Sequence, residues 1–462
     1  MLELLNMYKR VPLGIKSTLK SIYGSVPLKI RLPKSFYKKL AFLEESQWWS
    51  LNELENYQNE ELRRLVRHAY ENVPYYNNLF RALKLKPQDI KRIEDLKKLP
   101  ILIKNDVRKY FNQLRAVNFK DSDIITISTG GTTGKPLQIY YEKNREYLNN
   151  EPFVWRFFGW GGHKIGELRA TLSNWTLFHS RIHSYNPVRN LLILSTYNMN
   201  INNVEEYANA IKKFGIRFLD GYPSSIEFLT KNMKIKKIKR PVELEAIFSF
   251  AEYLSDTQRK MIEEFWRCKC FDRYSLEERC VLATECEKHK GLHLCLDYGI
   301  TEFVKSEVPG FNKVIGTSFT NYAMPLIRYD TEDIGKLVKD KCECGRRFPL
   351  FILKGGRQKN FAIAKDNSFI PVANIDIPNV TENVLQYQFI QERKGALLLN
   401  IVRKDTFQDK DLIAIKSKLV EKFDDNMDVE IRFSDAVDRT PKHKSPIFIQ
   451  KMVGKVNNGD LS

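Results

Sequence analysis

The chain has 462 residues, 43% of them hydrophobic and 12% aromatic, and a formal net charge of +19 from 75 Lys and Arg against 56 Asp and Glu. A chain of this length and apolar content exceeds what one core usually serves, so we expect two or more packed domains and exclude a disordered protein. No window approaches the 18 or so uninterrupted apolar residues of a transmembrane helix. Lys9, Arg10 and Lys16 interrupt any signal-peptide core, so we expect a cytoplasmic protein.

The N-terminal segment 1–40 is strongly basic, with nine Lys and Arg against a single acid, Glu3. Such an excess suits an anionic surface, and it predicts peripheral contact with the inner face of a membrane. A solvated, lysine-rich face is the alternative. The chain contains no zinc-finger, homeodomain or RRM signature, so we do not expect nucleic acid as a partner.

Residues 36–115 are predicted to be mainly helical. Between Asn52 and Tyr70, Leu and Val recur at helical spacing above a charged face. The helix should end before Pro74, because a proline disfavours helix in the residue that precedes it.

A Gly- and Thr-rich loop follows at 128–136, with the sequence STGGTTGKP. Apolar alternation at 124–127 and 137–141 predicts a strand on each side, which makes the loop the crest of a hairpin. Its glycines permit unusual backbone dihedrals, and their N–H groups can form a concave nest for an anion. The candidate phosphate-binding residues are Ser128, Thr129, Gly130, Gly131, Thr132, Thr133, Gly134 and Lys135.

A Walker A loop is the obvious rival, and the residues exclude it. The first glycine of that motif would fall at position 129, which is Thr129. The residue after Lys135 should carry a hydroxyl for Mg²⁺, and it is Pro136. A flexible polar hairpin without a ligand is the remaining alternative.

The run TGGTTGKP resembles the phosphate-binding signature of the acyl-adenylate-forming superfamily, in the phenylacetate–CoA ligase-like branch that includes CapK-type capsule-cluster proteins. The resemblance spans residues 40–450, and its motifs occur in the family's order. It implies ATP and Mg²⁺ as cofactors and Thr133 as a catalytic residue. It also implies an α/β fold with a large N-terminal domain of mixed β-sheets and helices and a small α+β C-terminal lid. The expected divisions are a large domain at 1–354, with a helical lead-in at 1–115 and an excursion at 280–345, a hinge at 355–360 and a lid at 361–462.

Strand-like and helical runs alternate from 118 to 350, as in an α/β domain. Within this region the run GYPSS resembles the family segment that opens the helix walling the acid pocket, which makes Tyr222 and Pro223 candidate substrate-pocket residues. Ordinary core packing of Tyr222 is the alternative.

A buried strand is predicted at Ala246–Leu254, then a helix from Asp256 and a short strand into DRYSLEE. That run resembles the family's Y-G-x-T-E segment, in which the tyrosine stacks near adenine and the glutamate holds Mg²⁺. Tyr274 and Glu278 occupy the matching positions, whereas Ser275 and Glu277 depart from the family's residues. A solvated acidic patch is the alternative reading.

The segment 324–335, MPLIRYDTEDIG, resembles the family's P-L-x-R-Y-x-T-x-D motif. Asp333 matches the aspartate that accepts hydrogen bonds from both ribose hydroxyls, a task that suits an acceptor-only carboxylate. Arg328 is expected to neutralise and orient nearby groups.

Two further segments complete the resemblance. The run KGGR ends at Arg357 and matches the hinge, although Lys359 stands where an acid is usual. The run RTPKHKS resembles the segment whose lysine bridges the substrate carboxylate and the α-phosphate. Lys444 aligns with that lysine, His443 replaces a glycine, and Lys442 lies close enough to compete for the role.

All seven cysteines lie between positions 268 and 344, which in a cytoplasmic chain favours metal binding over disulfides. Cys286, His293, Cys342 and Cys344 resemble a zinc site of the same branch, and four such ligands form the closed tetrahedral set of a structural zinc. Cys280 or His289 could replace one ligand, and Cys268 with Cys270 forms a competing pair. Buried free thiols are the alternative.

The resemblance implies an ATP-dependent ligase that activates a carboxylic or amino acid as an acyl-AMP, with release of pyrophosphate. The acyl group would then pass to CoA, a carrier-protein thiol or an amine, in the setting of surface polysaccharide assembly. Two alternatives stay open: a catalytically degenerate scaffold protein of the same fold, and a basic protein whose function is to bind a membrane surface or nucleic acid.

Overall fold

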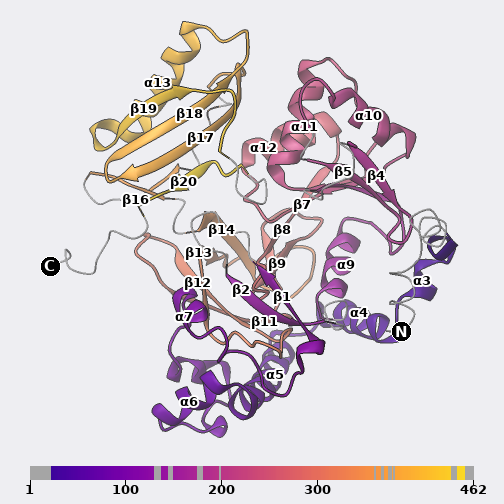
Figure 1. Ribbon diagram of the computed structural model, residues 1–462, viewed down its shortest axis with the longest axis vertical. Coiled ribbons are helices and arrows are strands. Elements are labelled where there is room, and N and C mark those ends of the chain that lie inside the picture. Colours follow the sequence, from indigo (N-terminus) through magenta and orange to yellow (C-terminus); the bar gives the residue numbers. More distant parts are fainter. Residues whose placement is uncertain are drawn as a thin grey trace.

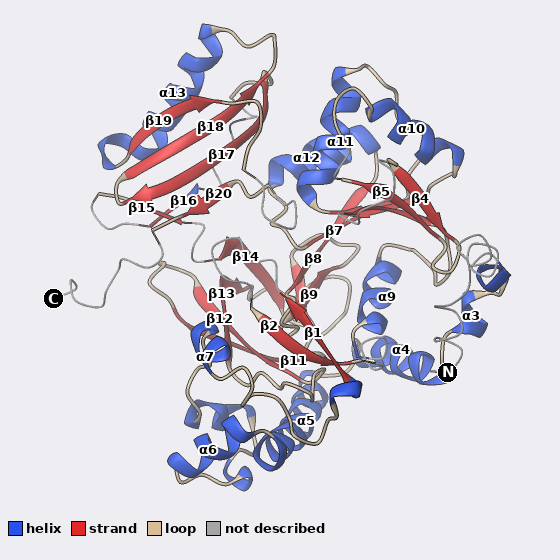
Figure 2. Cartoon of the chain, viewed as in Figure 1, coloured by secondary structure: helices blue, strands red, loops and turns tan. Residues whose placement is uncertain are grey.

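The computed structural model describes residues 22–128, 137–143, 149–173, 181–196, 199–357, 361–365, 369–372, 377, 380–438 and 445–452. Figures 1 and 2 show helices at one end, a long mixed sheet with helices on it, and a small C-terminal sheet unit. The described helices are α3 (Leu28–Arg31), α4 (Lys34–Ser46), α5 (Leu51–Asn72), α6 (Pro74–Ala82), α7 (Lys104–Lys109), α9 (Glu151–Trp160), α10 (Val204–Lys213), α11 (Pro223–Ile235), α12 (Asp256–Trp266) and α13 (Asp409–Phe423). The described strands are β1 (Ile124–Ser128), β2 (Gln138–Glu142), β3 (Arg169–Ser173), β4 (His183–Asn186), β5 (Leu191–Ser195), β6 (Phe218–Gly221), β7 (Ala246–Phe250), β8 (Lys269–Ser275), β9 (Leu282–Glu285), β10 (Leu292–Leu294), β11 (Gly299–Lys305), β12 (Asn312–Ser318), β13 (Tyr329–Leu337), β14 (Leu350–Arg357), β15 (Phe361–Ile363), β16 (Phe369–Pro371), β17 (Val384–Arg393), β18 (Ala396–Arg403), β19 (Asp428–Phe433) and β20 (Phe448–Gln450).

The helical lead-in forms where the sequence predicts it. Helix α5 begins with a capping box: the Ser50 hydroxyl accepts from the Glu53 amide at 3.2 Å, and the Glu53 carboxylate accepts from the Ser50 amide at 2.7 Å. The helix ends at Asn72, and Pro74 then starts α6, as predicted. The apolar face of α5 packs into the largest core, against residues of the sheet's antiparallel half.

The first half of the large sheet is a parallel α/β unit. Strands β5, β3, β6, β7 and β8 are neighbours in that order and run parallel. Helices α10, α11 and α12 pack on one face, and α9 covers the other with Phe157 and Phe158 against Phe218, Phe248 and Phe271. Successive side chains of a strand point to opposite faces of the sheet, so neighbouring residues of these strands pack into different cores.

The second half of the sheet is antiparallel and continues from β8 through β9, β10, β14, β13, β12 and β11. It packs on α5 and α6 through the largest core cluster, which also contains Leu137, Ile139 and Tyr141 of the β1–β2 hairpin. The two strands predicted around the Gly/Thr-rich loop are confirmed, and Ser128 pairs with Gln138 at the end of the hairpin. The predicted strand at Ala246–Leu254 is too long, because β7 ends at Phe250 and Ala251 has a φ of 64°.

The C-terminal unit is a four-stranded sheet in the order β19-β18-β17-β20, with α13 packed on it and its own core. Figure 1 shows it beside the large sheet, next to α12. This mixed α/β architecture with a small C-terminal domain confirms the predicted fold class. None of the helices that the structure describes combines the length and apolarity needed to cross a membrane.

A buried ion pair connects three distant segments of the large domain. Arg156 of α9 forms a bidentate pair with Asp297, and their side chains are 3% and 0% exposed. Asp297 also accepts from the Ser46 hydroxyl at 2.6 Å, while Arg156 donates to the Leu43 carbonyl at 3.1 Å. The pair therefore joins α4, α9 and the segment before β11.

Removal of one member of this pair should destabilise the large domain. Replacement of Asp297 with Ala leaves the Arg156 charge buried and uncompensated, which costs about 3–5 kcal/mol of unfolding free energy. We expect a clear fall in the urea midpoint followed by tryptophan fluorescence. Glu243→Ala, which removes the exposed partner of Arg240, should cost less than about 1 kcal/mol. Equal midpoints for the Asp297 and Glu243 variants would contradict this role.

Candidate active site

Two buried carboxylates, Glu278 and Asp333, are each bound by a tyrosine of the opposite motif. Tyr274 of β8 donates its hydroxyl to Asp333 Oδ2 at 2.7 Å. Tyr329 at the start of β13 donates to Glu278 Oε1 at 2.9 Å. Glu278 is 3% and Asp333 5% exposed. The two sequence motifs that carry the acids therefore hold each other in place.

These contacts require the sheet to curl. Three strands, β9, β10 and β14, lie between β8 and β13 in the sheet order, yet their side chains meet in one core. The β13–β14 pairing shifts register between Asp333 and Gly335, and such irregularities bend a strand and redirect a side chain. Gly335 is needed at this point, because a Cβ there would lie 2.1 Å from Cε2 of Phe351.

The electrostatics of this centre follow from burial next to the two acids. Burial and the Asp333 charge raise the pKa of Tyr274 well above its usual value, and burial with the Glu278 charge does the same for Tyr329. Burial and both carboxylates raise the pKa of the Cys280 thiol. The tyrosines therefore stay protonated donors, and Cys280 stays a neutral thiol. An ionised carboxylate has about four acceptor sites, and a tyrosine hydroxyl occupies only one of them on each acid.

The β1–β2 hairpin is attached to the segment that carries Glu278. The Tyr141 hydroxyl of β2 donates to the Glu277 carbonyl, and the Arg279 guanidinium stacks on the Tyr141 ring at 4.3 Å. Ser128 ends β1 and is exposed. Tyr141, three residues from the loop end of β2, thus attaches the hairpin to the segment of Glu278. Residues 129–136, with the other candidate phosphate-binding residues, lie outside the described residues.

The guanidinium of Arg328 is engaged in a buried ion pair with Glu302. Its guanidinium contacts both carboxylate oxygens of Glu302 in β11, at 3.0 and 2.9 Å, and donates to the Leu99 carbonyl. It has a φ of 55°. In this structure Arg328 joins the helical lead-in to the start of β13.

The predicted pocket residues lie at the carboxyl ends of the parallel strands. Tyr222 caps α11 directly after β6, and Pro223 is the first helical residue and is buried. The Tyr222 ring contacts Phe250 at the end of β7, with centroids 5.7 Å apart. Ligands of open α/β sheets bind at this edge.

The segments from the lid and hinge are described only in part. Arg357 closes β14 and its backbone pairs with Asp333, but its side chain is outside the described part, as are Lys359 and the segment 439–444 with Lys442, His443 and Lys444. A groove between α11, α12 and β17 is lined partly by Ser224, Gln258, Tyr387 and Ser445. The residue that follows Lys444 therefore faces the helix that begins after Tyr222.

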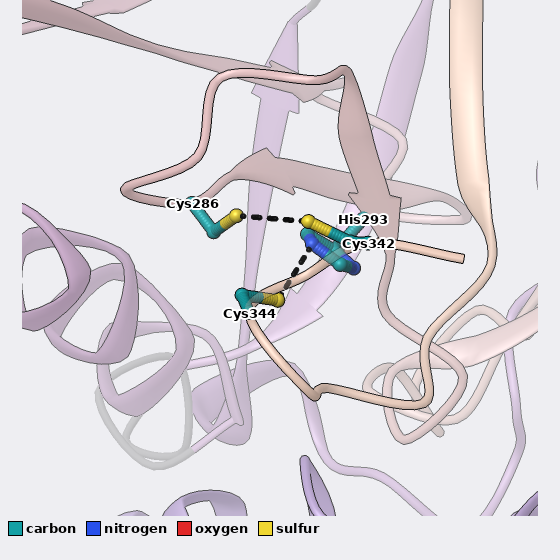
Figure 3. Close-up of side chains that lie close together, drawn as sticks. All are labelled: Cys286, His293, Cys342 and Cys344. Atoms are coloured by element: carbon teal, nitrogen blue, oxygen red, sulfur yellow. Dashed lines mark hydrogen bonds between the residues drawn. The ribbon is translucent and has the colours of Figure 1, made fainter. Parts of the chain in front are cut away.

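Figure 3 shows a second centre, in which Cys286, His293, Cys342 and Cys344 converge from the end of β9, from β10 and from a turn before β14. Their ligand atoms all lie within 4.8 Å of one another. Cys286 Sγ is 3.7 Å from Cys342 Sγ, and Cys344 Sγ is 3.3 Å from His293 Nε2. Thiolates about 2.3 Å from a tetrahedral ion are separated by about 3.7 Å, so the spacing suits a metal.

The histidine tautomer also suits a metal ligand. His293 Nδ1 is 3.0 Å from the Phe348 carbonyl, which fixes the proton on Nδ1 and leaves Nε2 as an acceptor directed at the cluster. The alternative ligands lie elsewhere: Cys280 belongs to the large core, Cys268 and Cys270 to the core around α12, and His289 contacts Glu285 at 3.4 Å. Within the described chain, the predicted four residues are the set that the fold brings together.

Two residues of this region were not assigned a role from the sequence. Tyr329 binds Glu278, and its place inside the motif shared with Asp333 could have indicated a contact. Arg273 directly precedes Tyr274 in β8. A charged residue in a largely buried strand is unusual, and this could have marked Arg273 as a functional candidate.

Comparisons with known proteins identify proteins of similar sequence and fold. Residues 363–451 match the CapK C-terminal domain. The chain is 24% identical to Protein CapK of Staphylococcus aureus over 461 residues, covering 96% of this chain and 99% of that protein. It is 26% identical to the phenylacetate–coenzyme A ligase of Thermus thermophilus over 353 residues, covering 74% and 78%.

Among solved structures, 2-hydroxyisobutyryl-CoA ligase in the postadenylation state, in complex with R3-HIB-AMP, superposes with a TM-score of 0.70 at 16% identity. The match covers 87% of this chain and 90% of that one, which shows a shared fold. Residues 363–451 thus match the CapK C-terminal domain, and the whole chain resembles CapK in sequence and the adenylate-forming ligases in fold.

Proposed function

We propose that this chain, an adenylate-forming ligase by family, activates a carboxylic acid with ATP and transfers the acyl group to a thiol or an amine. A carboxylate is a poor electrophile because its leaving group would be oxide. Attack of a carboxylate oxygen on the α-phosphorus breaks the bond to pyrophosphate and gives an acyl-AMP. Attack of the acceptor on the acyl carbon then releases AMP.

The observation that carries the proposal is the pair of buried carboxylates at one centre, each fixed by a tyrosine. Asp333 has acceptor capacity for the two ribose hydroxyls, next to Tyr274, which would stack near adenine. Glu278 is a hard oxygen donor that lies after β8, and it would hold Mg²⁺. Mg²⁺ bound there would neutralise the charge on the phosphates.

The remaining roles rest on the family resemblance. The loop residues from Ser128 to Lys135 would bind the phosphates, with Thr133 closest to the reaction, and Arg357 would act at the hinge. Lys444, or Lys442 in its place, would align the carboxylate with the phosphorus. Ser445, the next residue along the chain, lines the groove beside α11. Closure of the lid would bring the lysine into the site.

The acceptor is proposed to be CoA, a carrier-protein thiol or an amine. CoA has the most support, since 2-hydroxyisobutyryl-CoA ligase has been solved in complex with 2-HIB-AMP and CoA in the thioesterification state, with a TM-score of 0.58 to this chain. The place of the reaction in surface polysaccharide assembly rests on the similarity to CapK alone.

ATP–pyrophosphate exchange over a panel of carboxylic and amino acids tests the activity. Glu278→Gln should lower exchange about 100-fold or more, because charge stabilisation at the phosphates is lost. Asp333→Asn should mainly raise the KM for ATP. Glu60→Gln, on an exposed face of α5, should exchange like wild type. Exchange that survives Glu278→Gln unchanged would contradict the assigned site, and a wild type that neither exchanges nor binds ATP would contradict the function.

The cysteine–histidine cluster is proposed to hold a structural zinc ion through Cys286, His293, Cys342 and Cys344. Four protein ligands leave no open position, so the ion would stabilise the fold without taking part in the reaction. The cluster joins β9, β10 and the turn before β14, which are the strands between β8 and β13. Zinc would thereby support the curl that brings the two acids together.

Metal analysis of the purified protein should find about one zinc per chain, as expected for one closed site. Cys342→Ser should remove most of it and lower the melting temperature, because metal binding contributes to folding. Cys268→Ser is the matched control, since Cys268 packs in the core around α12 and should leave the zinc content unchanged. Equal zinc loss in both variants, or none in either, would argue against this set of ligands.

A further inference from the structure

Arg273 lies on β8 directly before Tyr274 and points to the other face of the sheet. Consecutive strand residues face opposite sides, so Tyr274 reaches Asp333 while Arg273 shares the face of Phe271, under α9. Its guanidinium carbon lies 5.2 Å from the ring centroid of Phe250 and 5.7 Å from that of Phe157. Arg273 therefore lies beside the aromatic core under α9, on the face of β8 opposite the two buried acids.

No carboxylate of the described chain pairs with this arginine. Its Nε is fully buried and has no hydrogen-bond partner among the described residues. Two of the acids nearby are engaged elsewhere: Asp220 pairs with Arg169 at 2.8 Å, and Asp272 accepts from the Ser249 hydroxyl at 2.6 Å. The third, Glu151 at the start of α9, acts on Arg273 through its charge but forms no ion pair with it among the described residues. Burial lowers the pKa of Arg273, although Asp220 and other acids act in the opposite direction.

Other shielded arginines of this protein are compensated. Arg156 pairs with Asp297, Arg169 with Asp220, Arg259 with Glu285 and Arg328 with Glu302. A guanidinium carries five N–H donors, and leaving a buried donor without an acceptor is costly. Cation–π contacts with two phenylalanines supply no acceptor for Nε. Within the described chain, the Arg273 guanidinium is therefore an incompletely satisfied cation.

Arg273 adjoins the predicted acid pocket. Phe250, which packs on Arg273, also contacts the ring of Tyr222 at the start of α11. The carboxyl ends of β6, β7 and β8 meet here. Tyr298 lies within the electrostatic reach of both Arg273 and Arg279, and Arg279 directly follows Glu278. Arg273 is thus on the acyl side of the site and the nucleotide-binding acids are on the other.

We propose that Arg273 is a specificity-determining residue that binds a second anionic group of the acid, so that the preferred substrate is a dicarboxylic acid. The inference rests on the proposed function and names its substrate class. A guanidinium fork binds a carboxylate through two parallel hydrogen bonds, and aromatic walls exclude competing water. A neutral acyl chain would bury the same cation without an acceptor, so the site would discriminate against it.

Acids matched in length test the proposal by ATP–pyrophosphate exchange: succinate against butyrate, glutarate against valerate, and adipate against hexanoate. For the best pair, wild type should favour the dianion in kcat/KM by about 100-fold or more. Arg273→Met should abolish that preference chiefly through KM for the dianion, and Arg273→Lys should retain part of it. Arg273→Glu should shift preference towards an ω-amino acid of the same length, which a purely structural arginine would not produce.

The melting temperature of each variant is also measured with and without each acid. This readout reports binding and does not depend on turnover. A dianion should raise the melting temperature of wild type and not that of Arg273→Met, even if no acid supports exchange. Wild type could instead exchange as well or better with the monocarboxylic acids as with the dicarboxylic acids of the same length, and Arg273→Met could do the same. That result would overturn the inference and leave the ligase function intact. Loss of exchange and of ATP binding in wild type overturns the function instead. Absence of any dianion-dependent stabilisation then overturns the inference as well.

Discussion

The reciprocal hydrogen bonds between two tyrosines and two buried carboxylates are the constraint on which the rest of the structure depends. Tyr274 holds Asp333 and Tyr329 holds Glu278, so neither motif can take its position without the other. Buried carboxylates are costly unless they are bound. The two tyrosine hydroxyls supply part of that binding.

The surrounding architecture maintains that geometry. The sheet must curl across three intervening strands, and the cluster of Cys286, His293, Cys342 and Cys344 joins those strands at one edge. Arg328 attaches the helical lead-in to β13. On the opposite side, α9 and the aromatic residues of β6, β7 and β8 form a separate core. Strand β8 therefore separates the centre with the two buried acids from the aromatic core under α9.

Much of this arrangement was predictable from local sequence, and the exceptions have physical causes. Strands, helix ends and the hairpin follow from alternation, capping and proline. The family resemblance predicts the four cysteine and histidine residues that converge in the structure. The partner of Glu278 and the ion pair of Arg328 are contacts between segments far apart in sequence, which no local pattern encodes. The isolation of Arg273 is likewise visible only when its neighbours are known. Residues 1–21, 129–136 and Lys444 lie outside the described residues, so the roles of the basic N-terminus, the Gly/Thr-rich loop and Lys444 stay predictions.

The central claim is that the acid is activated by attack of its carboxylate on the α-phosphorus of ATP. An acid that supports exchange, labelled with ¹⁸O in its carboxyl group, tests this directly when it is turned over with ATP and CoA or hydroxylamine. Because the bridging oxygen of the acyl-AMP comes from the acid and leaves with the nucleotide, the account predicts ¹⁸O in AMP by mass spectrometry. Label in inorganic phosphate together with ADP, or AMP without label, would contradict it.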